Sequence, residues 1–115
     1  MPYIEIIYND NKKTFPINSI DTSIGRSEQC DITIKEDKGV SRFHCAIQQQ
    51  TSDSFVLLEQ DTKNGTFLNG KQLFKEIVEL QNNDTIKIGN GTKIIFHEEK
   101  LTQEMFQDDD QDLII

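Results

Sequence analysis

Three short segments of this 115-residue chain hold the side chains best suited to binding an anion. The segments are Gly25-Arg26, Ser41-Arg42-Phe43-His44 and Lys63-Asn64-Gly65-Thr66, each at the edge of a stretch with β character. Arg26 offers a planar fork of N–H donors, and Ser41 offers a hydroxyl. Arg42 and Lys63 add positive charge, and Asn64 has an amide that can pair with a peptide backbone. Together these groups predict a site for a phosphorylated peptide.

Each motif taken alone has a simpler interpretation. Arg26 could be a surface arginine at the end of a strand, and Ser41 with Arg42 could belong to an ordinary loop. Ser41 and His44 could also be imagined as a nucleophile beside a base. The sequence shows no orienting acid and no nucleophile-elbow pattern, so we expect His44 to brace a loop by hydrogen bonding.

Two further ligand classes are weaker matches. Residues 65–72 approximate the phosphate loop of nucleotide hydrolases, but Gln72 stands where a Ser or Thr hydroxyl would hold magnesium. The segment also has the pattern of a hairpin. Asp108, Asp110 and Asp112 lack the glycine and the closing glutamate of a calcium loop. We therefore expect neither a metal nor a cofactor.

The charge is unevenly distributed. The net charge is −8, of which residues 98–115 contribute −6 and residues 1–97 only −2. This balance argues against general nucleic-acid binding, which requires a basic face. Within the body, a local basic island is predicted near the three motifs by Arg26, Lys35, Lys38, Arg42 and Lys63.

Neither a secretion signal nor an apolar segment of about 20 residues is evident in the sequence. Cys30 and Cys45 match neither a redox pair nor a zinc cluster, so we expect free, reduced thiols. These features favour a cytoplasmic or nuclear protein.

Short alternating or β-branched segments recur along the body, separated by turn signals, and predict an all-β sandwich of ten short strands. The predicted strands cover residues 3–8, 14–17, 22–24, 31–34, 45–49, 55–59, 66–68, 71–73, 85–88 and 92–97. Turns are expected at residues 9–11, at Asn69-Gly70 and at residues 89–91. With little helical periodicity, a nucleotide-binding βαβ unit is not expected.

Residues 98–115 form a distinct acidic tail, with weak helical character at 101–107 and an apolar end at 113–115. Such a tail is either solvated and disordered or docked on a partner or on the domain's own surface. A further hypothesis is self-association, in which phosphorylated Thr102 or the acidic run occupies the basic site of the same or a neighbouring domain.

The order of the motifs across residues 1–97 resembles that of the forkhead-associated (FHA) domain family. The matching motifs are Gly25-Arg26, Ser41-Arg42-Phe43-His44, residues 62–66, Asn69-Gly70 and residues 80–89. The resemblance implies an eleven-stranded β-sandwich that binds phosphothreonine peptides through the loops at one end, with no enzymatic activity.

The resemblance also implies roles for individual residues. Arg26 and Ser41 would contact the phosphate, Arg42 and Lys63 would add charge, and Asn64 would hold the peptide main chain. His44 would brace the binding loops without touching the ligand. The turns would be shaped by Gly25, Gly65, Thr66, Asn69 and Gly70. Lys63 replaces the Ser or Thr often found before the Asn-Gly pair, so it cannot supply the same hydroxyl geometry.

The sequence therefore predicts a non-enzymatic module that recognises phosphothreonine in a protein or peptide, such as a Ser/Thr kinase substrate, and acts as a signalling adaptor or scaffold. The domain would span residues 1–97, followed by the tail at 98–115. The alternative is a phosphate-independent interaction protein that uses another face of the sandwich and keeps a vestigial site. No membrane partner is expected.

Overall fold

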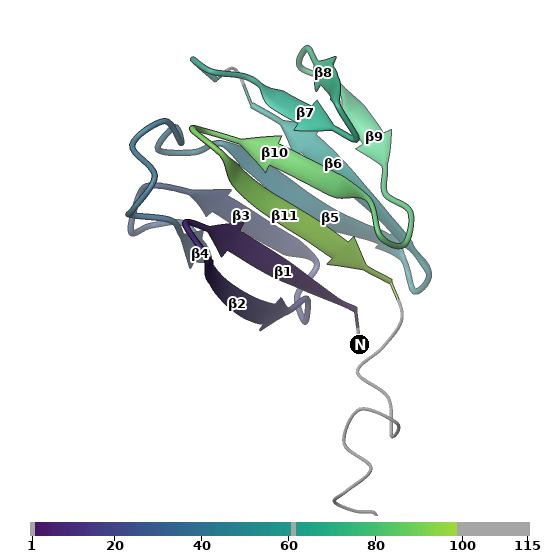
Figure 1. Ribbon diagram of the computed structural model, residues 1–115. Coiled ribbons are helices and arrows are strands. Elements are labelled where there is room, and N and C mark those ends of the chain that lie inside the picture. The colour runs from purple at the N-terminus through teal and green to yellow at the C-terminus, as the bar shows by residue number, and fades with distance from the viewer. Residues whose placement is uncertain (1, 61, 99–115) are drawn as a thin grey trace, which may run out of the picture.

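The computed structural model describes residues 2–60 and 62–98, and every regular element in these residues is a β-strand (Figure 1). The eleven strands are β1 (Tyr3–Tyr8), β2 (Asn11–Pro16), β3 (Asp21–Gly25), β4 (Ile32–Thr33), β5 (Cys45–Thr51), β6 (Ser54–Glu59), β7 (Thr66–Leu68), β8 (Lys71–Leu73), β9 (Ile77–Glu79), β10 (Thr85–Ile88) and β11 (Thr92–His97). The expectation of an all-β fold with about eleven strands is confirmed. The helix expected at 101–107 and the proposed docking or self-association of the tail lie outside the described residues.

The strands form two sheets that pack face to face as a sandwich (Figure 1). One sheet has six strands in the order β2-β1-β11-β10-β7-β8, and the other has five in the order β4-β3-β5-β6-β9. The strand pairs of the described residues are antiparallel except β3 with β4, which is parallel. Residues near the two ends of the described chain therefore share one sheet.

Alternation along the strands creates the core between the sheets. Ile4 and Ile6 on β1 lie opposite Phe96 and Ile94 on β11, and all four side chains are buried. Ile47 and Leu57 supply the same inward face on β5 and β6. Burying each large aliphatic or aromatic side chain contributes about 1.5–3 kcal/mol, so this alternation stabilises the sandwich.

β2 and β9 differ most from the sequence prediction, whereas β3, β4, β5 and β6 differ only by one or two residues at their ends. β2 begins at Asn11 rather than at 14, because Asn9 and Asp10 both adopt positive φ and close a two-residue turn. β9 was not predicted. It is three residues long, and it pairs with β6 through Leu57 and Val78. Its exposed Ile77 breaks the simple rule that apolar residues point inward.

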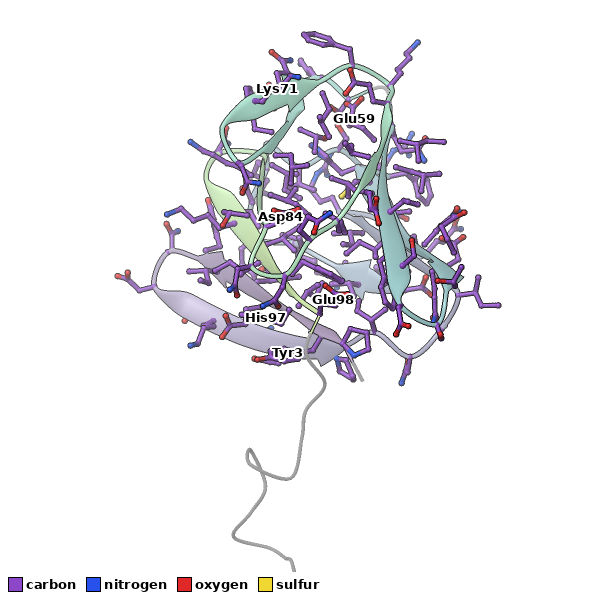
Figure 2. All side chains as sticks on the ribbon, turned by 90° about the vertical axis from the view of Figure 1, so that its right-hand side faces the viewer. Tyr3, Glu59, Lys71, Asp84, His97 and Glu98 are labelled. Carbon is purple, nitrogen blue, oxygen red and sulfur yellow. The ribbon has the colours of Figure 1, made fainter. Side chains whose placement is uncertain are left out.

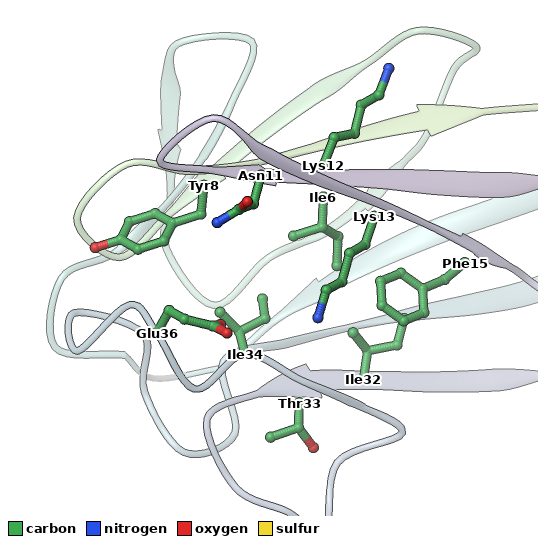
Figure 3. Close-up of a pocket in the computed structure, with 10 residues that line it drawn as sticks. All are labelled: Ile6, Tyr8, Asn11, Lys12, Lys13, Phe15, Ile32, Thr33, Ile34 and Glu36. Carbon is green, nitrogen blue, oxygen red and sulfur yellow. The ribbon is translucent and has the colours of Figure 1, made fainter.

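A groove remains where the edge strands β2 and β4 approach each other (Figure 3). Ile32 and Ile34 line one side and Phe15 the other. Lys13 extends into this groove, whereas Lys12 points away from it (Figure 3). An inward-pointing charge on an edge strand discourages pairing with another chain, which is a sufficient reason for Lys13 here.

The part of the chain that the structure describes contains no helix able to cross a membrane.

Candidate functional site

The sequence motifs come together at one end of the sandwich, on the left in Figure 1. The connections after β3, β4, β6 and β10 all emerge there, because these strands end on the same side. Backbone hydrogen bonds link the first two connections: Arg26 N–H donates to Ser41 O at 3.0 Å, and Ser27 N–H donates to Arg42 O at 3.1 Å. The Arg26 and Ser41 motifs, fifteen positions apart in sequence, are thus held side by side.

Arg26 directly follows β3 and has an exposed side chain. Its Nε donates to the carbonyl oxygen of Val40 at 2.8 Å. This bond anchors one edge of the guanidinium and leaves the two terminal nitrogens available to bind an oxyanion. Lysine has no equivalent of Nε and could not be anchored in this way.

Gly25 permits the close contact between these two loops. A Cβ at this position would overlap the carbonyl oxygen of Arg42 and lie 2.9 Å from Sγ of Cys30. The same carbonyl accepts hydrogen bonds from Ser27 N–H and from Cys30 Sγ. Glycine is therefore required here for space rather than for a special backbone angle.

His44 is fully buried and hydrogen-bonds to two loops. Its Nδ1 accepts from Ser41 N–H at 3.0 Å, so the ring proton is on Nε2, which donates to Gly65 O at 2.9 Å. Both ring nitrogens are thus occupied by backbone groups. His44 has no free nitrogen to take a proton from the Ser41 hydroxyl, which removes the nucleophile-and-base alternative for this pair.

Burial lowers the pKa of His44, while its hydrogen bond to Gly65 and the charges of Glu59 and Asp37 oppose the shift. A histidine kept neutral in the folded state costs stability once the unfolded chain binds a proton and the folded chain does not. We expect the free energy of unfolding to fall as pH drops below about 6.5, the ordinary histidine pKa. Above that pH, His44 should not lower the stability.

Urea unfolding between pH 5 and 8 measures this dependence of the free energy of unfolding on pH. His44→Gln should flatten the slope; an identical slope in both proteins would contradict the assignment.

The third motif enters through the connection between β6 and β7. Lys63 and Asn64 are exposed, and Asn64 Nδ2 donates to Gly39 O at 2.9 Å. Lys63 N–H lies 3.5 Å from the Ser41 hydroxyl oxygen. Asn64 therefore joins its loop to the Ser41 loop, and it retains a second N–H and its carbonyl oxygen for a peptide main chain.

Asp37 supports the candidate site, and the sequence analysis did not identify it. Its side chain is fully buried and accepts hydrogen bonds from Gly39 N–H, Asn90 N–H and the Thr92 hydroxyl at 2.9, 2.9 and 2.6 Å. Burial by itself raises the pKa of Asp37, but these hydrogen bonds outweigh it and hold the pKa below the usual value. Asp37 thus fastens the Ser41 loop to the start of β11.

Among the remaining predicted support residues, Thr66 lies next to Gly65, whereas Asn69 and Gly70 lie away from the site. Thr66 is buried at the start of β7. Asn69 and Gly70 form the expected hairpin turn with positive φ, but they sit beside Thr85, at the end of β7 away from Gly65. The structure brings Gly25, His44 and Gly65 to the site and does not bring Asn69 or Gly70 there.

Cys30 and Cys45 are both free and buried, as expected for reduced thiols. Burial raises the pKa of Cys30, and it raises the pKa of Cys45 to about 12. Both side chains are therefore protonated at neutral pH, and neither is an activated nucleophile.

Known proteins resemble this chain in sequence and in fold. The family model described as the FHA domain matches residues 22–89. The DNA damage response protein kinase DUN1 of Saccharomyces cerevisiae is 29% identical over 94% of this chain and 22% of that protein. Angiogenic factor with G patch and FHA domains 1 of Homo sapiens is 35% identical over 65% of this chain and 11% of that protein. The chain thus spans about a fifth or less of the length of these relatives.

Two solved structures have the same fold. The FhaA FHA domain, complexed with the intracellular domain of Rv3910, superposes with a TM-score of 0.74 at 23% identity, covering 84% of this chain and all of that one. The yeast Dun1 FHA domain, in complex with a doubly phosphorylated peptide derived from Rad53 SCD1, gives a TM-score of 0.70 at 26% identity, covering 88% of this chain and 77% of that one.

Proposed function

The chain belongs to the FHA domain family, and we propose from this that it binds phosphothreonine in a partner protein through the loops that hold Arg26, Ser41 and Asn64. The FHA domain is a binding module, and we assign this chain no catalytic step. Its role would be that of a signalling adaptor or scaffold that recruits the product of a Ser/Thr kinase.

The observation that supports this proposal most strongly is the anchored guanidinium of Arg26. Its Nε is fixed on Val40 O while its terminal nitrogens stay exposed beside the Ser41 loop. A phosphate with about −1.5 to −2 charges at pH 7 can accept two parallel hydrogen bonds from those nitrogens. Ser41 would add a hydroxyl, Arg42 and Lys63 would add charge, and Asn64 would bind the peptide backbone.

Lys63 should contribute less than Arg26. It is an exposed, flexible point charge, and exposed ion pairs contribute about 0.2–1 kcal/mol. We expect Lys63→Ala to weaken phosphopeptide binding about two- to fivefold, with the loss shrinking as salt is added. Isothermal titration calorimetry at two salt concentrations measures this, with Lys71→Ala on the distant β8 as the matched control. A loss as large as that of Arg26→Ala would contradict the ranking.

The proposal is tested by binding of the purified chain to degenerate peptide libraries that contain phosphothreonine, phosphoserine or unmodified threonine. A doubly phosphorylated library is a useful fourth arm, because the Dun1 domain was solved with such a peptide. Selective retention of phosphothreonine peptides, lost after phosphatase treatment, is the expected result. Equal retention of unmodified peptides would instead favour phosphate-independent association through another face.

We further propose that the folded unit spans residues 1–97, followed by a separate acidic segment at 98–115. The family model begins at residue 22, but β1 and β11 lie beyond its limits and pair with each other over five residues in the centre of the six-stranded sheet. Removing β1 would expose that sheet's core face. We also propose a cytoplasmic or nuclear location, which the two buried free thiols support.

A further inference from the structure

The outer face of the six-stranded sheet presents a band of lysines across its strands. Register places one residue of each of five strands in the same row, with its side chain directed away from the core because its strand neighbours are directed inward. We call this set the lysine row; it consists of Lys12, Ile7, Lys93, Lys87 and Phe67.

Two members of the lysine row oppose each other unfavourably. Lys87 on β10 and Lys93 on β11 are direct cross-strand partners, and both are exposed. Like charges at such positions destabilise a sheet. Neither lysine has an acidic partner among the residues that the structure describes. An anion between them would convert this repulsion into two attractions.

Apolar surface accompanies these charges. Phe67 and Ile7 flank the two lysines and are only half-buried. A hollow extends beside Phe67, lined also by Asn69, Gly70, Thr85, Lys87 and Lys93. The face therefore suits an extended segment that combines acidic with aliphatic side chains.

The face carries little negative charge of its own. Glu5 is the single acidic residue among the described strand residues of this sheet. Its carboxylate is already engaged by Lys12 at 3.3 Å and by His97 at 2.8 Å, and the His97 ring stacks on Tyr3. Glu5 thus offers little repulsion to a second acidic segment.

The chain itself contains a segment of the required chemistry. Four aspartates at 108–112 are followed by Leu113, Ile114 and Ile115. The described chain leaves the same sheet at Glu98, next to His97 and Tyr3 (Figure 2). His97 and Lys93 lie four positions apart on β11, about 13 Å, whereas the nine residues 99–107 can span up to about 30 Å when extended. The phosphate-binding loops lie at the opposite end of β11 (Figure 1).

We propose that residues 108–115 dock on the outer face of the six-stranded sheet of their own molecule. The aspartates lie over Lys87 and Lys93, and the aliphatic residues contact Phe67 and the hollow beside it. Tethering favours this arrangement, since a short linker gives the tail an effective local concentration near the millimolar range. The contact does not depend on phosphopeptide binding.

Paramagnetic broadening in the full chain tests this placement. A nitroxide is attached at Gln111→Cys, which keeps all acidic residues, while the buried Cys30 and Cys45 remain unlabelled; wild-type protein treated with the same reagent checks this. We expect loss of amide signal intensity centred on Phe67, Lys87 and Lys93. The loss should weaken in about 1 M salt, where the Debye length is about 3 Å.

Charge variants provide the decisive comparison. Lys87→Glu/Lys93→Glu should restore the intensities, and Lys87→Gln/Lys93→Gln should restore them in part. The matched variant Lys13→Glu/Lys71→Glu changes the same net charge at two other exposed lysines and should leave the broadening intact. The proposal would be overturned if the broadening persisted in Lys87→Glu/Lys93→Glu or were centred on Arg26 and Ser41. It would also be overturned if an isotope-labelled copy without nitroxide were broadened when mixed with an unlabelled copy that carries the nitroxide, because the contact would then be between molecules.

Discussion

Replacing Arg26 by alanine should reduce affinity for a phosphothreonine peptide by roughly 100-fold or more. Each hydrogen bond to a charged group is worth about 1.5–3 kcal/mol, and two are lost with the terminal guanidinium nitrogens. Every 1.4 kcal/mol corresponds to about a tenfold change in the dissociation constant. Calorimetric titration of wild type and variant with the same peptide measures the difference.

Arg26→Lys separates geometry from charge. It keeps the positive charge but loses both the anchor on Val40 O and the bidentate fork, so it should recover only a small part of the lost affinity. Because the Arg26 side chain is exposed, each variant should lower the free energy of unfolding only by about the 0.5–1.5 kcal/mol of the lost hydrogen bond to Val40 O. Full affinity in Arg26→Lys would show that the site recognises positive charge alone and that the anchored, bidentate guanidinium of Arg26 is not required.

Replacing Asp37 by alanine should lower the free energy of unfolding by about 3–5 kcal/mol, comparable with removal of one partner from a buried ion pair. The change leaves Gly39 N–H, Asn90 N–H and the Thr92 hydroxyl without their acceptor. Each buried donor left without a partner costs about 1–3 kcal/mol. Urea unfolding measures the loss, and the exposed Asp53→Ala is the matched control.

The pH dependence of Asp37 has a definite sign. Because its pKa is lower in the folded state, its contribution is fully present above the unfolded pKa of about 3.9 and is lost as pH falls through the folded value. Asp37→Asn, which keeps one acceptor oxygen, should give an intermediate loss at pH 7 and a weaker dependence below pH 4. A variant as stable as wild type at pH 7 would refute the fastening role.

Strand alternation made most of the fold predictable from sequence. In β11, buried residues alternate with less buried ones, and Ile4 and Ile6 of β1 are buried while Glu5 and Ile7 are less so; the sequence prediction for both strands matches the structure. β9 was not predicted because its three residues show no period and no hairpin turn signal adjoins them. β7 and β8 are equally short, but they flank the Asn69-Gly70 turn. The pairing of β9 with β6 is decided by tertiary contact. The sequence did not predict that β2 begins at Asn11, because an edge strand can be polar on both faces and then shows no alternation.

The sequence indicated the residue types of the candidate site but not the hydrogen bonds that hold its loops together. Arginine, serine and asparagine beside strand ends indicate an anion site without reference to tertiary structure. Asp37 gave no such signal, because it lies in a polar loop and its partners Asn90 and Thr92 are more than fifty positions away. The anchor from Arg26 to Val40 O likewise depends on how two loops meet.

Chemical-shift mapping with a phosphothreonine peptide shows directly whether the loops that hold Arg26, Ser41 and Asn64 bind the phosphate. Isotope-labelled full chain is titrated with a peptide selected from the phosphothreonine library and, separately, with the same peptide after phosphatase treatment. We expect the largest shift changes to fall on Arg26, Ser41 and Asn64 and to vanish when the phosphate is removed. Equal changes with the dephosphorylated peptide, or changes confined to the sheet faces, would contradict it.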